Sequence, residues 1–181
     1  MRRVVYRSIA GLVILLAIVL SGCATGYQPY SITGGYKNQQ VGPNRYYVEF
    51  YGNGNTNRDT VFAYWLYRCA ELTQEKGFDY FIIVSDAPPP GISGGSATIQ
   101  VASYTITTWS GRGVIELYKG VPSEYLDRVG IAKDIIAALG PAVREAMASH
   151  GNVKLPPGYS PDPPRRSGPL KLDDLEALLP K

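Results

Sequence analysis

Residues 45–84 read RYYVEFYGNGNTNRDTVFAYWLYRCAELTQEKGFDYFIIV, and this stretch decides the fold because it holds a strand, a helix and a second strand in succession. At residues 45–51, aromatic and β-branched side chains predict a strand. Alternation along that strand places Tyr46, Val48 and Phe50 on one face. The glycine- and asparagine-rich residues that follow predict a turn.

Apolar residues then recur at helical spacing as far as Lys76. Their period predicts a helix, with Thr56 as its N-cap and Gly77 at its C-terminal cap. Residues 78–84 form a nearly continuous apolar run, which predicts a second, central strand.

Farther along, alternation predicts another strand at residues 98–108, with a bulge near 102–104. Residues 91–95 are rich in glycine and are expected to be loop. A hairpin turn is predicted at residues 110–113, with a partner strand at 114–119.

Two more helices are predicted, at residues 127–139 and 142–149, with Gly140 and Pro141 interrupting them. The order is then strand, helix, three strands, helix. It predicts an α+β fold in which a small antiparallel sheet carries the helices on one face.

Near the N-terminus, Leu20-Ser21-Gly22-Cys23 forms a lipobox at the end of an apolar run. The small residues Ser21 and Gly22 before a cysteine are what lipoprotein signal peptidase requires. We expect cleavage between Gly22 and Cys23, with fatty acyl chains such as palmitate on the sulfur and amine of Cys23.

The segment before the lipobox is typical of a targeting signal. Arg2, Arg3 and Arg7 make it positive, and its apolar run, residues 9–20, is shorter than the roughly 20 residues that span a bilayer. Residues 1–22 are therefore predicted to be a signal peptide, the alternative being an uncleaved anchor helix.

Cleavage changes the charge of the chain. It leaves 181 − 22 = 159 residues and removes three arginines and no acidic residue. Lys and Arg then number 18 − 3 = 15 against 15 Asp and Glu, so the net charge of +3 belongs to the leader. A neutral chain does not support nucleic-acid binding.

Composition divides the mature chain into three parts. Residues 23–40 are expected to be a tether, residues 41–150 the folded domain, and residues 151–181 a proline-rich disordered tail. Four leucines near the end of the tail could line a short helix that docks on a partner or on the domain: Leu172, Leu175, Leu178 and Leu179.

No catalytic, cofactor or metal constellation is evident. The single histidine, His150, is interpreted as a favourable charge at a helix C-terminus, with a catalytic base as the alternative. Residues 52–57 match a dinucleotide-binding loop only weakly, and a tight turn is preferred. Cys69 lies within a helical pattern and is expected to be a buried, inert thiol.

Tyrosine is the strongest remaining bias, with 14 residues. Tyrosine suits interaction surfaces because it buries a large area and keeps a hydrogen-bonding tip. It also simply favours strands. The sequence leaves both interpretations open.

The chain also resembles a family of small Gram-negative lipoproteins of unknown function, over residues 27–84. The matching residues are Gly42-Pro43-Asn44-Arg45-Tyr46, Val48, Phe50, Gly52, Asn53, Thr56, Tyr67-Arg68-Cys69-Ala70-Glu71-Leu72 and Gly77-Phe78-Asp79-Tyr80-Phe81. That family has alanine where this chain has Cys69. The resemblance implies an envelope lipoprotein and no particular reaction.

Together these observations predict a non-catalytic binding or structural component of the cell envelope. Ala24 follows the lipidated cysteine where an aspartate would signal inner-membrane retention, so the expected location is the outer membrane, facing the periplasm. The expected partners are the membrane itself and an envelope protein. The alternative is a periplasmic small-ligand carrier or enzyme with a site between the sheet and the first helix, formed by Arg68, Glu71 or Asp79.

Overall fold

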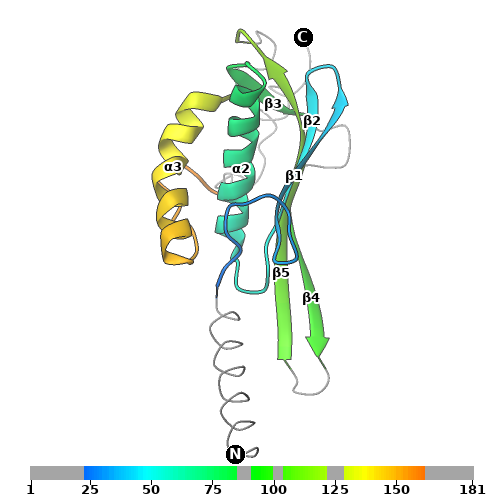
Figure 1. The fold of residues 1–181 in the computed structure, drawn as a ribbon, viewed down its shortest axis with the longest axis vertical. Helices are drawn as coiled ribbons and strands as arrows, with labels where there is room; N and C mark the ends of the chain where they lie inside the picture. The colour runs from blue at the N-terminus through cyan, green and yellow to red at the C-terminus, as the bar shows by residue number, and fades with distance from the viewer. Residues whose placement is uncertain (1–22, 85–90, 100–103, 122–128, 162–181) are drawn as a thin grey trace, which may run out of the picture.

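The sheet is antiparallel and has six strands, which confirms the predicted α+β class (Figure 1). The computed structural model describes residues 23–84, 91–99, 104–121 and 129–161. The strand order is β1-β2-β5-β3-β6, with β4 paired to β5. The strands are β1 (Gly35–Gly42), β2 (Arg45–Tyr51), β3 (Tyr80–Val84), β4 (Gly91–Ile99), β5 (Tyr104–Tyr118) and β6 (Val129–Ile131). The helices are α2 (Arg58–Glu75) and α3 (Ala132–Ser149).

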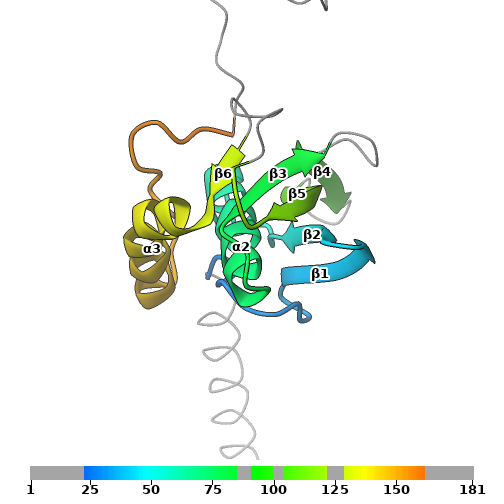
Figure 2. The ribbon, with the colours of Figure 1, turned by 90° about the horizontal axis from the view of Figure 1, so that it is seen from above.

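The core lies between the sheet and α2. As predicted, Tyr46, Val48 and Phe50 are buried on one face of β2. Trp65 of α2 is also buried, and its indole N–H donates to the Val48 carbonyl oxygen at 3.1 Å. Helix α3 packs against α2, so both helices lie on the same side of the sheet, as predicted (Figures 1 and 2).

The N-cap of α2 is Asn57, and the prediction of Thr56 was wrong by one residue. The Asn57 side chain accepts a hydrogen bond from the Thr60 backbone N–H at 2.8 Å, as an N-cap does. The Thr56 hydroxyl instead accepts a hydrogen bond from the Thr25 backbone N–H, outside the helix.

The C-terminal end of α2 is a Schellman motif, in agreement with the predicted role of Gly77. The Gly77 N–H donates to the Gln74 carbonyl, and the Phe78 N–H donates to the Thr73 carbonyl. Gly77 has a φ of 79°, which glycine adopts without strain.

The predictions for residues 91–113 were wrong in two places. Residues 91–95 belong to β4, and residues 110–113 continue β5. Gly111 and Gly113 are buried strand residues opposite Phe50 and Val48, so the two large side chains of β2 face positions without a side chain. The strand predicted at 98–108 is divided between β4 and β5, and most of its expected bulge lies outside the described residues.

The two predicted C-terminal helices are one helix, α3, and residues 129–131 form β6 instead. Pro141 lies inside α3 and is exposed, where its missing N–H leaves one helical hydrogen bond unmade. The buried face of α3 continues past it through Leu139 and Val143. Packing of this face against α2 outweighs the local break.

Both segments that flank the predicted domain contribute to it. Residues expected to be spacer form β1, and Tyr27 packs against the core. At the other end, Val153 is buried, and its backbone N–H donates to Thr60 Oγ1 at 2.7 Å. The domain therefore uses chain on both sides of residues 41–150.

Two predictions lie outside the described residues: the signal peptide at 1–22, with Gly22 before the cleavage point, and the leucine-lined segment at 172–179. Among the helices that the structure describes, none has the length and hydrophobicity to cross a bilayer.

Candidate functional site

Cys23, the predicted lipidation site, is exposed. Its carbonyl accepts a hydrogen bond from Asn53 Nδ2 at 3.0 Å. The N–H of the next residue, Ala24, donates to the His150 carbonyl at 3.3 Å. These contacts place Cys23 beside the N-terminus of α2 and the C-terminus of α3.

Thr25 attaches this segment firmly to the body. It is 2% exposed, and its backbone N–H donates to Thr56 Oγ1 at 2.8 Å. Its hydroxyl accepts from the Asn53 N–H and donates to the Thr33 carbonyl. A lipid on Cys23 would therefore join the folded body with almost no spacer, a feature that no local sequence signal reveals.

The loop that resembled a dinucleotide-binding turn has its own partners. The Asn55 and Thr56 N–H groups donate to Asn53 oxygens, and the Asn57 N–H donates to Asn152 Oδ1. The Asn53 N–H is bound by Thr25, as above. Because these backbone donors are occupied by protein atoms, the loop is built as a structural turn and not as a phosphate cradle.

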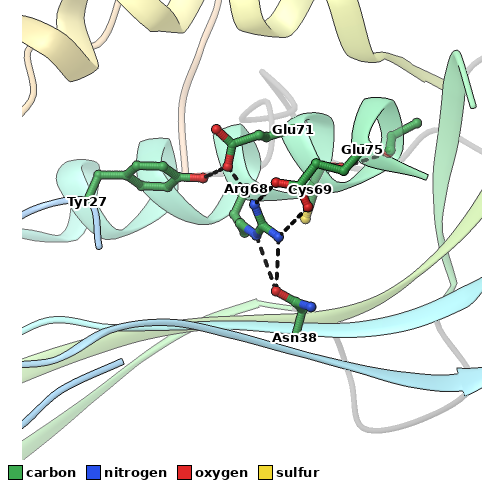
Figure 3. A network of polar contacts seen from close by, with 7 residues as sticks. Tyr27, Asn38, Arg68, Cys69, Glu71 and Glu75 are labelled. Atoms are coloured by element: carbon green, nitrogen blue, oxygen red, sulfur yellow. Dashed lines mark hydrogen bonds and ion pairs between the residues drawn. The ribbon is translucent and has the colours of Figure 1, made fainter. Parts of the chain in front are cut away.

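A cluster of polar and charged side chains lies between β1 and α2 (Figure 3). We call it the Arg68 cluster, and its members are Tyr27, Asn38, Arg68, Glu71 and Glu75. The Arg68 guanidinium donates to both carboxylates and to Asn38 Oδ1, at 2.6–3.3 Å. These five bonds match its five N–H donors. Arg68 is 5% exposed and also stacks on Tyr36, with Cζ 4.6 Å from the ring centroid.

The charges in this cluster stabilise one another. Burial alone would lower the pKa of Arg68, but the hydrogen bonds that it donates to Glu75 and Glu71 raise it. The same bond to Arg68 lowers the pKa of Glu75. Burial, together with a hydrogen bond to Glu71, raises the pKa of Tyr27. Arg68, Glu75 and Tyr27 are therefore held in their ordinary charge states, the opposite of what a general acid or base needs near neutral pH.

Of the three residues expected to form a site, Arg68 and Glu71 meet and Asp79 does not. Asp79 lies beyond the end of α2 and pairs with Lys119 at 3.3 Å, both being exposed. Cys69 is fully buried, as predicted, and burial raises the pKa of its thiol. A thiol in this state is a poor nucleophile.

The tyrosines are divided between the core and the surface of the sheet. Tyr46 and Tyr64 are buried in the core. On the sheet face away from the helices, five residues form what we call the tyrosine face: Tyr30, Lys37, Tyr47, Glu49 and Tyr51.

Charges and rings are paired within the tyrosine face. The Tyr47 and Tyr51 hydroxyls donate to Glu49 Oε1 at 2.9 and 2.7 Å. The Lys37 Nζ lies 3.7 Å from the Tyr30 ring centroid and 5.4 Å from that of Tyr51. Burial and the bond to Glu49 raise the pKa of Tyr51 to about 12.

A hollow of about 320 Å³ lies beside the tyrosine face, along β1 and β2. It is lined by Lys37, Asn38, Gln39, Tyr47 and Glu49. Its walls combine aromatic and hydrogen-bonding groups, a composition common in protein interfaces.

His150 is exposed and caps α3 with a left-handed backbone, φ 51°. Its place at the helix C-terminus agrees with the sequence interpretation. Within residues 23–84, 91–99, 104–121 and 129–161, no three His, Cys, Asp or Glu side chains are grouped closely enough to hold a metal ion.

Comparison of the chain with family models, curated proteins and solved structures finds no match.

Proposed function

We propose that this chain is a cell-envelope lipoprotein, held at a membrane through acylated Cys23, that acts as a non-catalytic binding or structural component. The observation that carries this proposal is the position of Cys23: it is exposed and lies beside the N-terminus of α2, next to residues that are hydrogen-bonded to the body. Several acyl chains hold a protein firmly, whereas one chain holds it only marginally.

The proposed location is the outer membrane, facing the periplasm. It is supported by Ala24, which replaces the aspartate of an inner-membrane retention signal. The lipobox and the resemblance to small Gram-negative lipoproteins point to the same compartment.

The Arg68 cluster supports a non-catalytic role. It fills the region between β1 and α2 where a carrier or an enzyme would need its site. Its carboxylates are tied to a guanidinium whose donors are all used, so they are poor candidates for proton transfer. We assign this cluster to the stability of the fold.

The proposed binding surface is the tyrosine face, and the proposed partner is an envelope protein. Tyrosine rings provide a large contact area at a small entropic cost, and their hydroxyls provide hydrogen bonds. Glu49 and Lys37 hold these rings in place before any partner arrives, which reduces the cost of binding.

The anchor is tested by mass spectrometry of the N-terminal peptide from protein purified from membranes. We expect a mature chain that begins at Cys23 and carries acyl chains. Cys23→Ser should move the protein out of the membrane fraction, whereas the matched variant Cys69→Ala should leave it there. An intact leader or an unmodified Cys23 thiol would refute the proposal.

The binding surface is tested by photo-crosslinking in intact cells. A photoreactive residue at Tyr47 should capture a defined envelope protein. The same residue at Lys133, an exposed position on α3, should not. Equal capture from both positions would count against the tyrosine face.

A further inference from the structure

One part of the sheet projects from the body of the molecule (Figure 1). Pairing of β2 with β5 ends at Tyr51 and Ser110, and the Gly52 N–H then donates to the Trp109 carbonyl. The next residue, Asn53, is the one that binds the Cys23 carbonyl. Cys23 therefore lies near the end of the β2–β5 pairing.

Beyond the end of this pairing, β4 is the one strand among the described residues that pairs with β5. The five pairs from Gly95–Thr108 to Ile99–Tyr104 form a two-stranded projection, which we call the β4–β5 arm. Five strand residues at about 3.3 Å each give it a reach of about 16 Å past the body. A two-stranded ribbon of this kind is only marginally stable in water.

The composition of the arm is unusual for an exposed edge. Residues 87–111 contain no Lys, Arg, Asp, Glu or His. Soluble proteins usually protect projecting edges with charged side chains, because bare edges aggregate. The register also alternates apolar pairs, such as Ala97–Ile106, with hydroxyl pairs, such as Ser96–Thr107.

We propose that the β4–β5 arm lies in the interfacial layer of the membrane that holds Cys23. This inference rests on the proposed lipid anchor. A lipid at Cys23 has almost no spacer, so it brings the base of the arm close to the bilayer surface. The arm has no charged residue, so contact with the bilayer would not bury a charge.

The chemistry of the arm also sets its depth. The outer edge of β4 has no strand paired to it among the described residues, and unpaired backbone groups are costly in hydrocarbon. The headgroup layer still offers hydrogen bonds to such groups. Trp109, half-buried at the base of the arm, belongs to a residue type that is enriched at this layer.

The test uses the lipidated protein in vesicles that contain bromine-labelled lipids. Thr108→Cys, in the arm, is labelled with an environment-sensitive fluorophore, and Gln40→Cys, at the other end of the molecule, is the matched control. Both positions are exposed. Labelling is specific, because the lipid occupies Cys23 and Cys69 is buried.

We expect the bromolipids to quench the label at Thr108 several-fold more than the label at Gln40. Ala97→Asp, added to the Thr108→Cys protein, should reduce this quenching. High salt should not, because the arm has no charge to screen. Each sample is also analysed by mass spectrometry for the lipid on Cys23.

Three results would overturn the inference. Equal quenching at both positions in lipidated protein would reject the arm contact and leave the anchor intact. The second result is an unquenched label at Thr108 together with crosslinking of the Thr108→Cys protein to a second copy. It would show that the arm mediates self-association instead. An unmodified Cys23 would reject the proposed function and this inference with it.

Discussion

Arg68 shows how a single side chain joins the two layers of the fold. It starts from α2 and reaches Asn38 on the edge strand β1, while Glu71 and Glu75 neutralise it from its own helix. A sequence shows the spacing of these three helical residues, which by itself is compatible with an ordinary surface ion pair. The guanidinium is buried because β1 lies against it. The local sequence pattern did not predict β1.

We predict that Arg68→Ala lowers the free energy of unfolding by about 1–3 kcal/mol, because it leaves two carboxylates and an amide without their donor. The value is below that of a fully buried pair, since the Glu71 and Glu75 side chains are 34% and 48% exposed. Urea denaturation measures it. Arg144→Ala, at an exposed position on α3, is the control and should change stability by less than about 0.5 kcal/mol.

Glu75 gives the cluster a pH dependence. Its hydrogen bond to Arg68 lowers its pKa in the folded state. The stability it contributes is therefore present above its unfolded pKa, near 4.5, and is lost as the pH falls through the lower folded value. The urea midpoint of the native protein should fall in this acid range more steeply than that of Glu75→Gln. Parallel curves would show that Glu75 contributes nothing.

At the scale of elements, long-range packing outweighed two local signals that predicted a break in the chain. Gly140 and Pro141 predicted a break that α3 does not make, because its apolar face stays packed on α2 across the proline. Gly111 and Gly113 predicted a turn, yet they lie in the middle of β5 opposite two large side chains of β2. Gly77 behaves as predicted, because its role is local to the end of α2.

The end of α2 gives a prediction at this scale. Gly77→Ala should destabilise the protein by about 1 kcal/mol, because alanine is strained at φ 79° even though the space around Gly77 is open. Gly120→Ala is the matched control: its surroundings are equally open, and its φ is outside the left-handed region. Thermal unfolding of both variants separates backbone strain from crowding. Equal midpoints would contradict the strain.

At the scale of the whole molecule, residues far apart in sequence close the end that carries Cys23. The segment after α3 returns to the start of α2, where Asn152 Oδ1 accepts from the Asn57 N–H and from Thr60 Oγ1. The segment before β1 reaches the same end through Thr25. The segments before β1 and after α3 thus both bind the start of α2, near the proposed lipid anchor.

We predict that a mature chain ending at His150 is less stable than one ending at Pro161 by about 2–4 kcal/mol. The shorter chain loses the buried Val153 side chain and its hydrogen bond to Thr60. Urea denaturation of the two chains gives the difference directly. Equal stability would mean that residues 151–161 do not support the domain.

Sequence alone determined the α+β class, the buried face of β2, the span of α2 and the burial of Cys69, because each depends on periodicity or composition within one short segment. It also predicted the lipid anchor, which remains a prediction. Only the tertiary structure decided that residues 35–42 join the sheet, that α3 continues through Pro141 and that Arg68 is buried in a saturated cluster. These features depend on contacts between distant segments, whose packing energy exceeds the local preferences that a sequence pattern displays.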